Sequence, residues 1–196
     1  MRSWPNIAAN RGKSPRESEE GMIREGQKAP DFALPGVEGG EPAVFELFRA
    51  IEDDAVLLWF VPATFLPTAT AELCAIRDLG WHDLPGLRVW ALSMDSIYAS
   101  AAYADRYDLP MAFLGDAASA AEYYGVRYDE WEGHYGAPKR AVFLVGTDWD
   151  VAFAWASDDA FDPSDPSPVE RVGPSVAEAC PEARTDVSVD YGSYSR

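Results

Sequence analysis

Cysteine, histidine and lysine are scarce in this chain of 196 residues. Cys74 and Cys180 are the only cysteines, too few for a disulfide framework, and this favours a reducing, cytoplasmic compartment. His82 and His134 are the only histidines, and no Cys/His spacing typical of a zinc site occurs. We therefore expect neither a metal site nor a bound cofactor.

Long apolar runs are missing as well. No run approaches the roughly 20 apolar residues that cross a bilayer, so we expect no membrane segment. The first 21 residues are polar and lack the apolar region of a secretory signal. We interpret residues 1–21 as a disordered N-terminal extension. Because the domain pattern begins directly after Met22, this residue is an alternative start of the protein.

Positive charge is the third deficit: the formal net charge is −17, with 33 acidic against 16 basic residues. Such a surface repels phosphate backbones and anionic lipids, which excludes nucleic-acid and membrane-surface binding as expected functions. Lysine occurs only at Lys13, Lys28 and Lys139. Dispersed acid with little lysine is typical of a salt-rich cytoplasm, where screening tolerates self-repulsion. We predict a halophilic, haloarchaeal protein; the alternative is an ordinary acidic one.

Apolar residues are plentiful, at 47% of the chain, and predict a packed core. Short apolar runs at 55–60, 87–92 and 141–145 are typical of strands buried on both faces. Residues 151–155 place large side chains at every second position, which indicates a further strand, and 146–150 predicts the hairpin turn before it.

Helical patterns lie between these strands, at 70–79, 96–107 and 117–124. We expect Asp95 or Ser96 to cap the second helix, Asp116 to cap the third and Gly125 to end it. The order of elements predicts an α/β domain with a thioredoxin-like fold, a central mixed sheet flanked by helices.

The two ends of this pattern are less regular. Residues 29–35 predict a short edge strand, and 44–49 a strand-to-helix corner. After about residue 158 the chain becomes polar and rich in proline, with a helical turn predicted only at 176–183. We expect a redoxin domain over 22–160 and a mostly polar, flexible tail over 161–196.

Two segments, Gly26–Pro35 and Phe60–Pro62, match a known pattern. The first resembles the opening, and the second the start of the active-site loop, of the peroxiredoxins of the alkyl hydroperoxide reductase / thiol-specific antioxidant group. The helix after that loop is matched by Thr70–Asp78, and the strand bearing the active-site arginine by Pro138–Val145. Ala154–Asp159 resembles the following strand end. The resemblance spans roughly residues 26–159, in the family's order and spacing.

The resemblance also implies a defect. Members reduce hydroperoxides with a cysteine thiolate, in a loop that reads Pro, three residues, Thr, two residues, Cys. Pro62 starts this pattern, but Leu66 stands at the threonine position and Ala69 at the cysteine position. The family arginine is matched by Arg140. The scaffold and one electrostatic partner are thus present, whereas the nucleophile and the hydroxyl are not.

Cys74 is the candidate replacement thiol, at an offset that holds the resolving cysteine in some members. On a helix it lies about 7.5 Å along the axis and about 140° around it from Ala69, so it should not point into the same pocket. We predict a small buried hydrophobe at Cys74; the alternative is an exposed redox-active thiol. Cys180 is expected to be a solvent-exposed thiol. Arg140 either faces an anion or forms an ion pair, for example with Glu72.

Three functions follow. The first is a peroxiredoxin-like binding or regulatory module without peroxidase activity. The alternative is an active thiol oxidoreductase, an antioxidant that uses Cys74 and takes a hydroperoxide or a thiol reductant protein as partner. The third is a scaffold kept for assembly. We expect a homodimer or a higher oligomer, formed through sheet edges and helix faces. An aromatic cluster is a candidate contact, with core packing as the alternative use of some of its members, which are Tyr123, Tyr124, Tyr128, Trp131 and Tyr135.

Overall fold

The computed structural model describes residues 21–115 and 117–194 of the chain. The predicted N-terminal extension and the Asp116 cap therefore lie outside the described residues, apart from Gly21.

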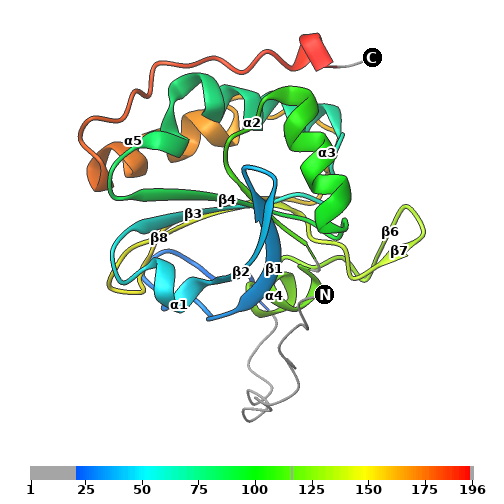
Figure 1. Ribbon diagram of the computed structural model, residues 1–196, viewed down its shortest axis with the longest axis horizontal. Coiled ribbons are helices and arrows are strands. Elements are labelled where there is room, and N and C mark those ends of the chain that lie inside the picture. Colours follow the sequence, from blue (N-terminus) through cyan, green and yellow to red (C-terminus); the bar gives the residue numbers. More distant parts are fainter. Residues whose placement is uncertain (1–20, 116, 195–196) are drawn as a thin grey trace.

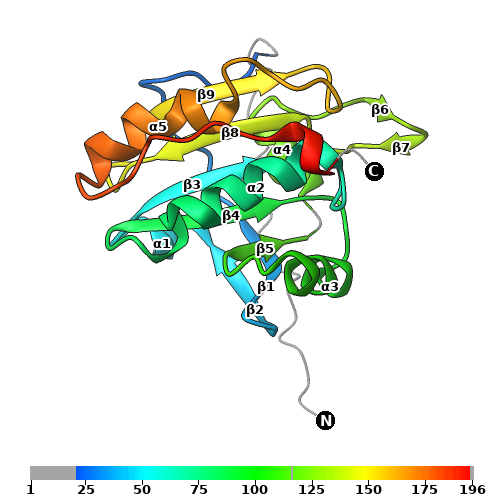
Figure 2. The ribbon, with the colours of Figure 1, turned by 90° about the horizontal axis from the view of Figure 1, so that it is seen from above.

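The described residues build one central sheet of seven strands, in the order β2-β1-β5-β4-β3-β8-β9 (Figure 2). β3, β4 and β5 are parallel to one another, and the remaining pairs are antiparallel. This confirms the predicted mixed sheet. The strands are β1 (Ala33–Glu38), β2 (Glu41–Glu46), β3 (Ala55–Phe60), β4 (Leu87–Leu92), β5 (Ala112–Leu114), β8 (Arg140–Val145) and β9 (Val151–Ser157).

Helices cover both faces of the sheet, as Figure 1 shows. One face carries α2 (Pro67–Leu79), α3 (Ile97–Tyr107) and α5 (Pro168–Ala179). The other carries the short helices α1 (Leu47–Ala50) and α4 (Ala118–Tyr123). Successive strand residues point to opposite faces, so each face has its own apolar core. Trp59 of β3 is buried in the first core and Phe60 in the second.

The regular elements follow the predicted pattern closely. The strands expected at 55–60 and 87–92 occupy those residues. β8 extends the strand predicted at 141–145 by one residue, and β9 extends the strand predicted at 151–155 by two. The Ser96 hydroxyl caps α3 by accepting a hydrogen bond from the amide of Ala99 at 3.3 Å. α2 starts three residues before the predicted Thr70, because Pro67 fits the first helical position. Gly125 ends α4 with φ +68°.

The prediction of a short edge strand at 29–35 is wrong in its residue range and in its place in the sheet. β1 begins at Ala33 and lies between β2 and β5, inside the sheet. The reason is a tight turn: Gly39 and Gly40 have φ of +56° and +82°, and they fold β2 back onto β1 as the true edge. β2 then leads directly into α1, which confirms the strand-to-helix corner at 44–49.

The segment after residue 160 is more ordered in secondary structure than we expected. α5 occupies Pro168–Ala179, so the helical turn predicted at 176–183 was too short and too late. The Ser167 hydroxyl and the Glu170 carboxylate form a reciprocal capping box at its start. Val169, Val172 and Val176, on one side of the helix, are buried against the sheet. The packed chain therefore continues beyond residue 160.

After α5 the chain returns across the outer face of α2 (Figures 1 and 2). We call residues 184–194 the C-terminal strap; it ends in the 3₁₀ turn η2 (Tyr191–Tyr194). At its start, Trp81 of the 3₁₀ turn η1 (Trp81–Asp83) donates from Nε1 to the carbonyl of Arg184 at 2.8 Å. A small hairpin, β6 (Glu130–Trp131) and β7 (His134–Tyr135), projects away from the sheet on the right of Figure 1. In the described part of the chain no helix is long and apolar enough to cross a membrane.

Candidate functional site at the start of helix α2

The loop after β3 delivers the family-like motif to the first turn of α2. Pro62 is buried just beyond the strand, Leu66 is the N-cap residue, and Ala69 is the third helical residue and buried. Two threonines fix this turn: Thr70 Oγ1 donates to the carbonyl of Leu66 at 2.8 Å, and Thr68 Oγ1 to the carbonyl of Ala160 at 2.6 Å. The helix start is formed and anchored, and it presents a methyl group at residue 69.

Aromatic side chains pack beside this turn. Phe65 adopts φ +64°, which is strained for a residue with a large side chain. Its ring lies 4.9 Å from that of Tyr103 on α3, and the buried Tyr103 hydroxyl donates to Thr70 Oγ1 at 2.9 Å. Burial raises the pKa of Tyr103, so the phenol stays protonated and remains a donor. Tyr107 adds a third ring, centred 6.1 Å from Phe65.

Arg140 and Glu72 form a fully buried ion pair across β8 and α2, with side chains 1% and 0% exposed. Arg140 Nε donates to Glu72 Oε1 at 3.0 Å, and Nη2 donates to the same oxygen. The hydroxyl of Tyr191, from the C-terminal strap, also donates to Oε1, at 2.8 Å. Burial raises the pKa of Glu72, whereas the Arg140 and Tyr191 hydrogen bonds act in the lowering direction.

The other donors of Arg140 are also engaged. Nη1 donates to the carbonyl of Asp162 at 2.8 Å and lies 3.4 Å from Ser164 Oγ, and Nη2 donates to Tyr191 Oη at 3.1 Å. The guanidinium also lies over the ring of Trp155, 5.2 Å from its centre. Of the two alternatives for Arg140, the ion pair with Glu72 is the one present in the structure.

Both cysteines are buried, and neither lies in the first turn of α2. Cys74, a residue of α2, is buried in the core cluster, as we expected for a small hydrophobe, rather than exposed. It lines a pocket of about 270 Å³ together with residues of the strap. The prediction that Cys180 is solvent-exposed is wrong. Cys180 ends α5 and is buried against Pro85, with its Sγ 3.6 Å from the Pro85 carbonyl, and burial raises the pKa of its thiol.

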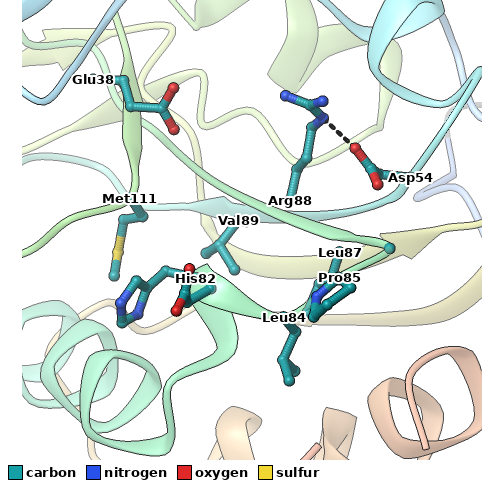
Figure 3. Close-up of a pocket in the computed structure, with 11 residues that line it drawn as sticks. Glu38, Asp54, His82, Leu84, Pro85, Leu87, Arg88, Val89 and Met111 are labelled. Atoms are coloured by element: carbon teal, nitrogen blue, oxygen red, sulfur yellow. Dashed lines mark hydrogen bonds and ion pairs between the residues drawn. The ribbon is translucent and has the colours of Figure 1, made fainter. Parts of the chain in front are cut away.

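A second pocket, of about 290 Å³, opens between η1 and β4 (Figure 3). His82 and several acidic residues line it, and Arg88 Nε donates to Asp54 Oδ2 at 2.7 Å along one wall. None of Pro62, Leu66, Ala69, Cys74 and Arg140 lines it. Among the residues that the structure describes, no group of three or more His, Cys, Asp or Glu side chains is arranged to hold a metal ion.

Comparison with known proteins decides the family. The model of the AhpC/TSA family matches residues 25–154, which include the loop, α2 and Arg140. The chain belongs to the AhpC/TSA family. The bcp protein of Coxiella burnetii, which carries a peroxiredoxin name, is 33% identical over 138 residues, covering 68% of this chain and 88% of its own. This AhpC/TSA protein thus has the family scaffold that its motifs predict.

Solved structures agree. Peroxidoxin BcpB from Mycobacterium tuberculosis is 28% identical and superposes with a TM-score of 0.60, over 72% of this chain and 90% of its own. AhpC from Enterococcus faecalis, at 24% identity, has a TM-score of 0.65 over 80% of this chain and 96% of its own, a likeness of fold alone. The fold is therefore the thioredoxin-like fold of peroxiredoxins. α5 and the strap lie after residue 154, where the match to the family model ends.

Sequence reasoning missed the residues that cover the helix start. Tyr191 is 119 positions from Glu72, and no local pattern links the two. Tyr103 and Tyr107 were detectable in principle, because tyrosines four positions apart share one side of a helix. The Ser167 and Glu170 spacing was likewise the sequence signature of a helix start.

Proposed function

We propose that this AhpC/TSA protein is a binding or regulatory module that does not reduce hydroperoxides through a cysteine. The observation that carries the proposal is Ala69, a buried methyl group in the anchored first turn of α2. In the family pattern this position holds the attacking cysteine. The surrounding scaffold is intact, so the loss is one of chemistry rather than of fold.

Peroxide reduction needs a populated thiolate at this position. A helix N-terminus and a nearby cation would lower the pKa of such a thiol. Here the helix terminus is present without a thiol, Leu66 supplies no hydroxyl, and the Arg140 guanidinium is held by Glu72 and its neighbours. All the changes act in the same direction, against peroxide chemistry at this turn.

One observation favours the alternative, an active thiol oxidoreductase with Cys74 as its reactive group. Cys74 is not part of a disulfide and lies beside a pocket bordered by the strap. A hydroperoxide or a thiol reductant protein would then have to reach it from that side. Its burial argues against this function, since reactive thiols sit in partly exposed, electropositive surroundings.

A peroxide-consumption assay tests the proposal. Purified full-length protein in high-salt buffer is supplied with hydrogen peroxide or an organic hydroperoxide, and with a dithiol or a thioredoxin system as reductant. We expect no consumption above that of the reductant alone. The matched control is Cys74→Ser; thiol-dependent turnover in the native protein that disappears in this variant would overturn the proposal and establish the alternative.

We further propose a homo-oligomer in the cytoplasm of a halophilic cell. Of the aromatic cluster, Tyr123 and Tyr135 are exposed and free to contribute to a contact between copies, whereas Tyr124 is fully buried in the core. Trp131 stacks between Tyr128 and Phe161 within the chain. Light scattering in high salt tests this, and a monomer would contradict it.

A further inference from the structure

The C-terminal strap covers α2 with a regular pattern of inward and outward residues. Val187, Val189 and Tyr191 are partly buried, whereas the residues between them, Ser188 and Asp190, are exposed. This alternation is that of an extended chain with one packed side. Both valines pack against the core cluster that contains Cys74. The strap is therefore one chain thick, with solvent outside and the α2 core inside.

The strap is fixed at its two ends by polar contacts. At the start, the Arg184 carbonyl accepts the Trp81 Nε1–H bond. At the end, the Tyr191 hydroxyl donates to Glu72 and accepts from Arg140. A phenol that bonds to both members of a buried ion pair makes hydrogen bonds stronger than neutral ones.

A pocket between α2 and the strap shows where the two elements meet. Its lining comes from α2, including Ala71 and Cys74, and from the strap, including Val187 and the outward-facing Ser188 and Asp190, so the pocket lies along the edge of the strap. The volume is about 270 Å³, and the Cys74 residue beside it is only 2% exposed. Moving the strap would remove its side of this pocket and uncover the core beneath Val187 and Val189. It would leave α2 in place, because Thr68 of α2 also bonds to the Ala160 carbonyl and Thr70 accepts a hydrogen bond from Tyr103.

We propose that the C-terminal strap is a detachable cover with Tyr191 as its latch, and that its opening controls the access of small solutes to Cys74 and to the Glu72–Arg140 pair. Segments with few buried apolar contacts and exposed backbone open locally, at a lower free-energy cost than global unfolding. The strap meets this description, whereas α2 does not. The proposal holds whichever function the protein has, since it concerns access alone.

Thiol labelling measures this access directly. In a Cys180→Ser background, Cys74 is the only thiol, and its reaction with the neutral disulfide 4,4′-dithiodipyridine is followed by the released thiopyridone. Tyr191→Phe keeps the ring and removes the latch hydroxyl. We expect Cys74 to be labelled about tenfold faster, the factor expected for one lost hydrogen bond to a charged group. Tyr98→Phe, at an exposed tyrosine of α3, is the matched control and should leave the rate unchanged.

A second thiol separates local opening from general loosening. In a Cys74→Ser background, Cys180 reports on the end of α5, ahead of the strap. Its labelling should be unaffected by Tyr191→Phe. Equal acceleration at both thiols, or no acceleration at Cys74, would overturn the proposal. If Tyr191→Phe does not fold, Val189→Ala weakens the middle of the strap instead and should again accelerate labelling of Cys74 but not of Cys180; an unchanged Cys74 rate in that variant would overturn the proposal as well.

Discussion

Removing Arg140 should expose how much the buried ion pair contributes to stability. Arg140→Met keeps an unbranched apolar stem and leaves the Glu72 carboxylate buried without its cation. It also removes the hydrogen bond to the Asp162 carbonyl. Breaking a buried pair in this way costs about 3–5 kcal/mol. With a urea m-value of about 1–3 kcal/mol/M, the unfolding midpoint should fall by roughly 1–5 M.

Arg88 supplies the matched control. Its Nε lies 2.7 Å from an Asp54 oxygen, but these side chains are 49% and 21% exposed. Exposed pairs contribute about 0–1 kcal/mol. Arg88→Met should therefore cost at least 2 kcal/mol less than Arg140→Met in the same urea titration at pH 7 and high salt. Equal costs for the two variants would refute the energetic role assigned to burial of the Glu72–Arg140 pair.

The cost of Arg140→Met should also depend on pH. Without Arg140, burial dominates and holds the pKa of Glu72 above its ordinary value, so the folded variant binds the proton more tightly than the unfolded chain does. Stability is then greatest at low pH and falls as pH rises through the folded pKa. The difference in free energy of unfolding between Arg140→Met and the native protein should accordingly narrow as pH is lowered from 7 toward 5. A difference that widens over this range would contradict the reasoning.

Three further predictions concern the site, the core and the surface. Ala69→Cys with Leu66→Thr should gain slow thiol-dependent peroxide consumption, because the helix terminus favours a thiolate while Arg140 remains held by Glu72; no gain over Leu66→Thr alone would contradict it. Burial raises the pKa of Tyr124, so stability should drop by about 1.4 kcal/mol per pH unit above roughly pH 10, and Tyr124→Phe should flatten that slope in alkaline urea titrations. Raising KCl from about 0.1 to 2 M should raise Tm, because salt screens repulsion within a net charge of −17; a lower Tm in salt would count against the halophilic interpretation.

The sheet was predictable where strands are buried on both faces. β3 and β4 are continuous apolar runs, and their bounds follow from composition alone. β5 has only three residues, Ala112–Leu114, too few for a recognisable period. α5 was missed because its prolines suggest a tail, although Pro168 stands at a helix start where proline is favoured.

Only the part of the candidate site formed by the loop and the start of α2, with Arg140, was predictable. The motif positions Pro62, Leu66 and Ala69 follow from the resemblance to the family's active-site loop, and Glu72 was named as a partner for Arg140 because Glu72 was expected in the first turn of the helix. The Tyr191 contact depends on the path of the strap after α5, and that path is set by tertiary packing. Burial of Cys180 likewise depends on tertiary packing, here of the end of α5 against Pro85.

The most direct test of the central claim is whether any thiol of the native protein reacts with peroxide. The full-length protein is treated with a few equivalents of hydrogen peroxide in high-salt buffer, with dimedone present to trap sulfenic acid, and its intact mass is measured. The account predicts an unchanged mass, because Ala69 has no thiol and Cys74 is buried under the strap. Rapid stoichiometric dimedone labelling at Cys74, absent in Cys74→Ser, would contradict it.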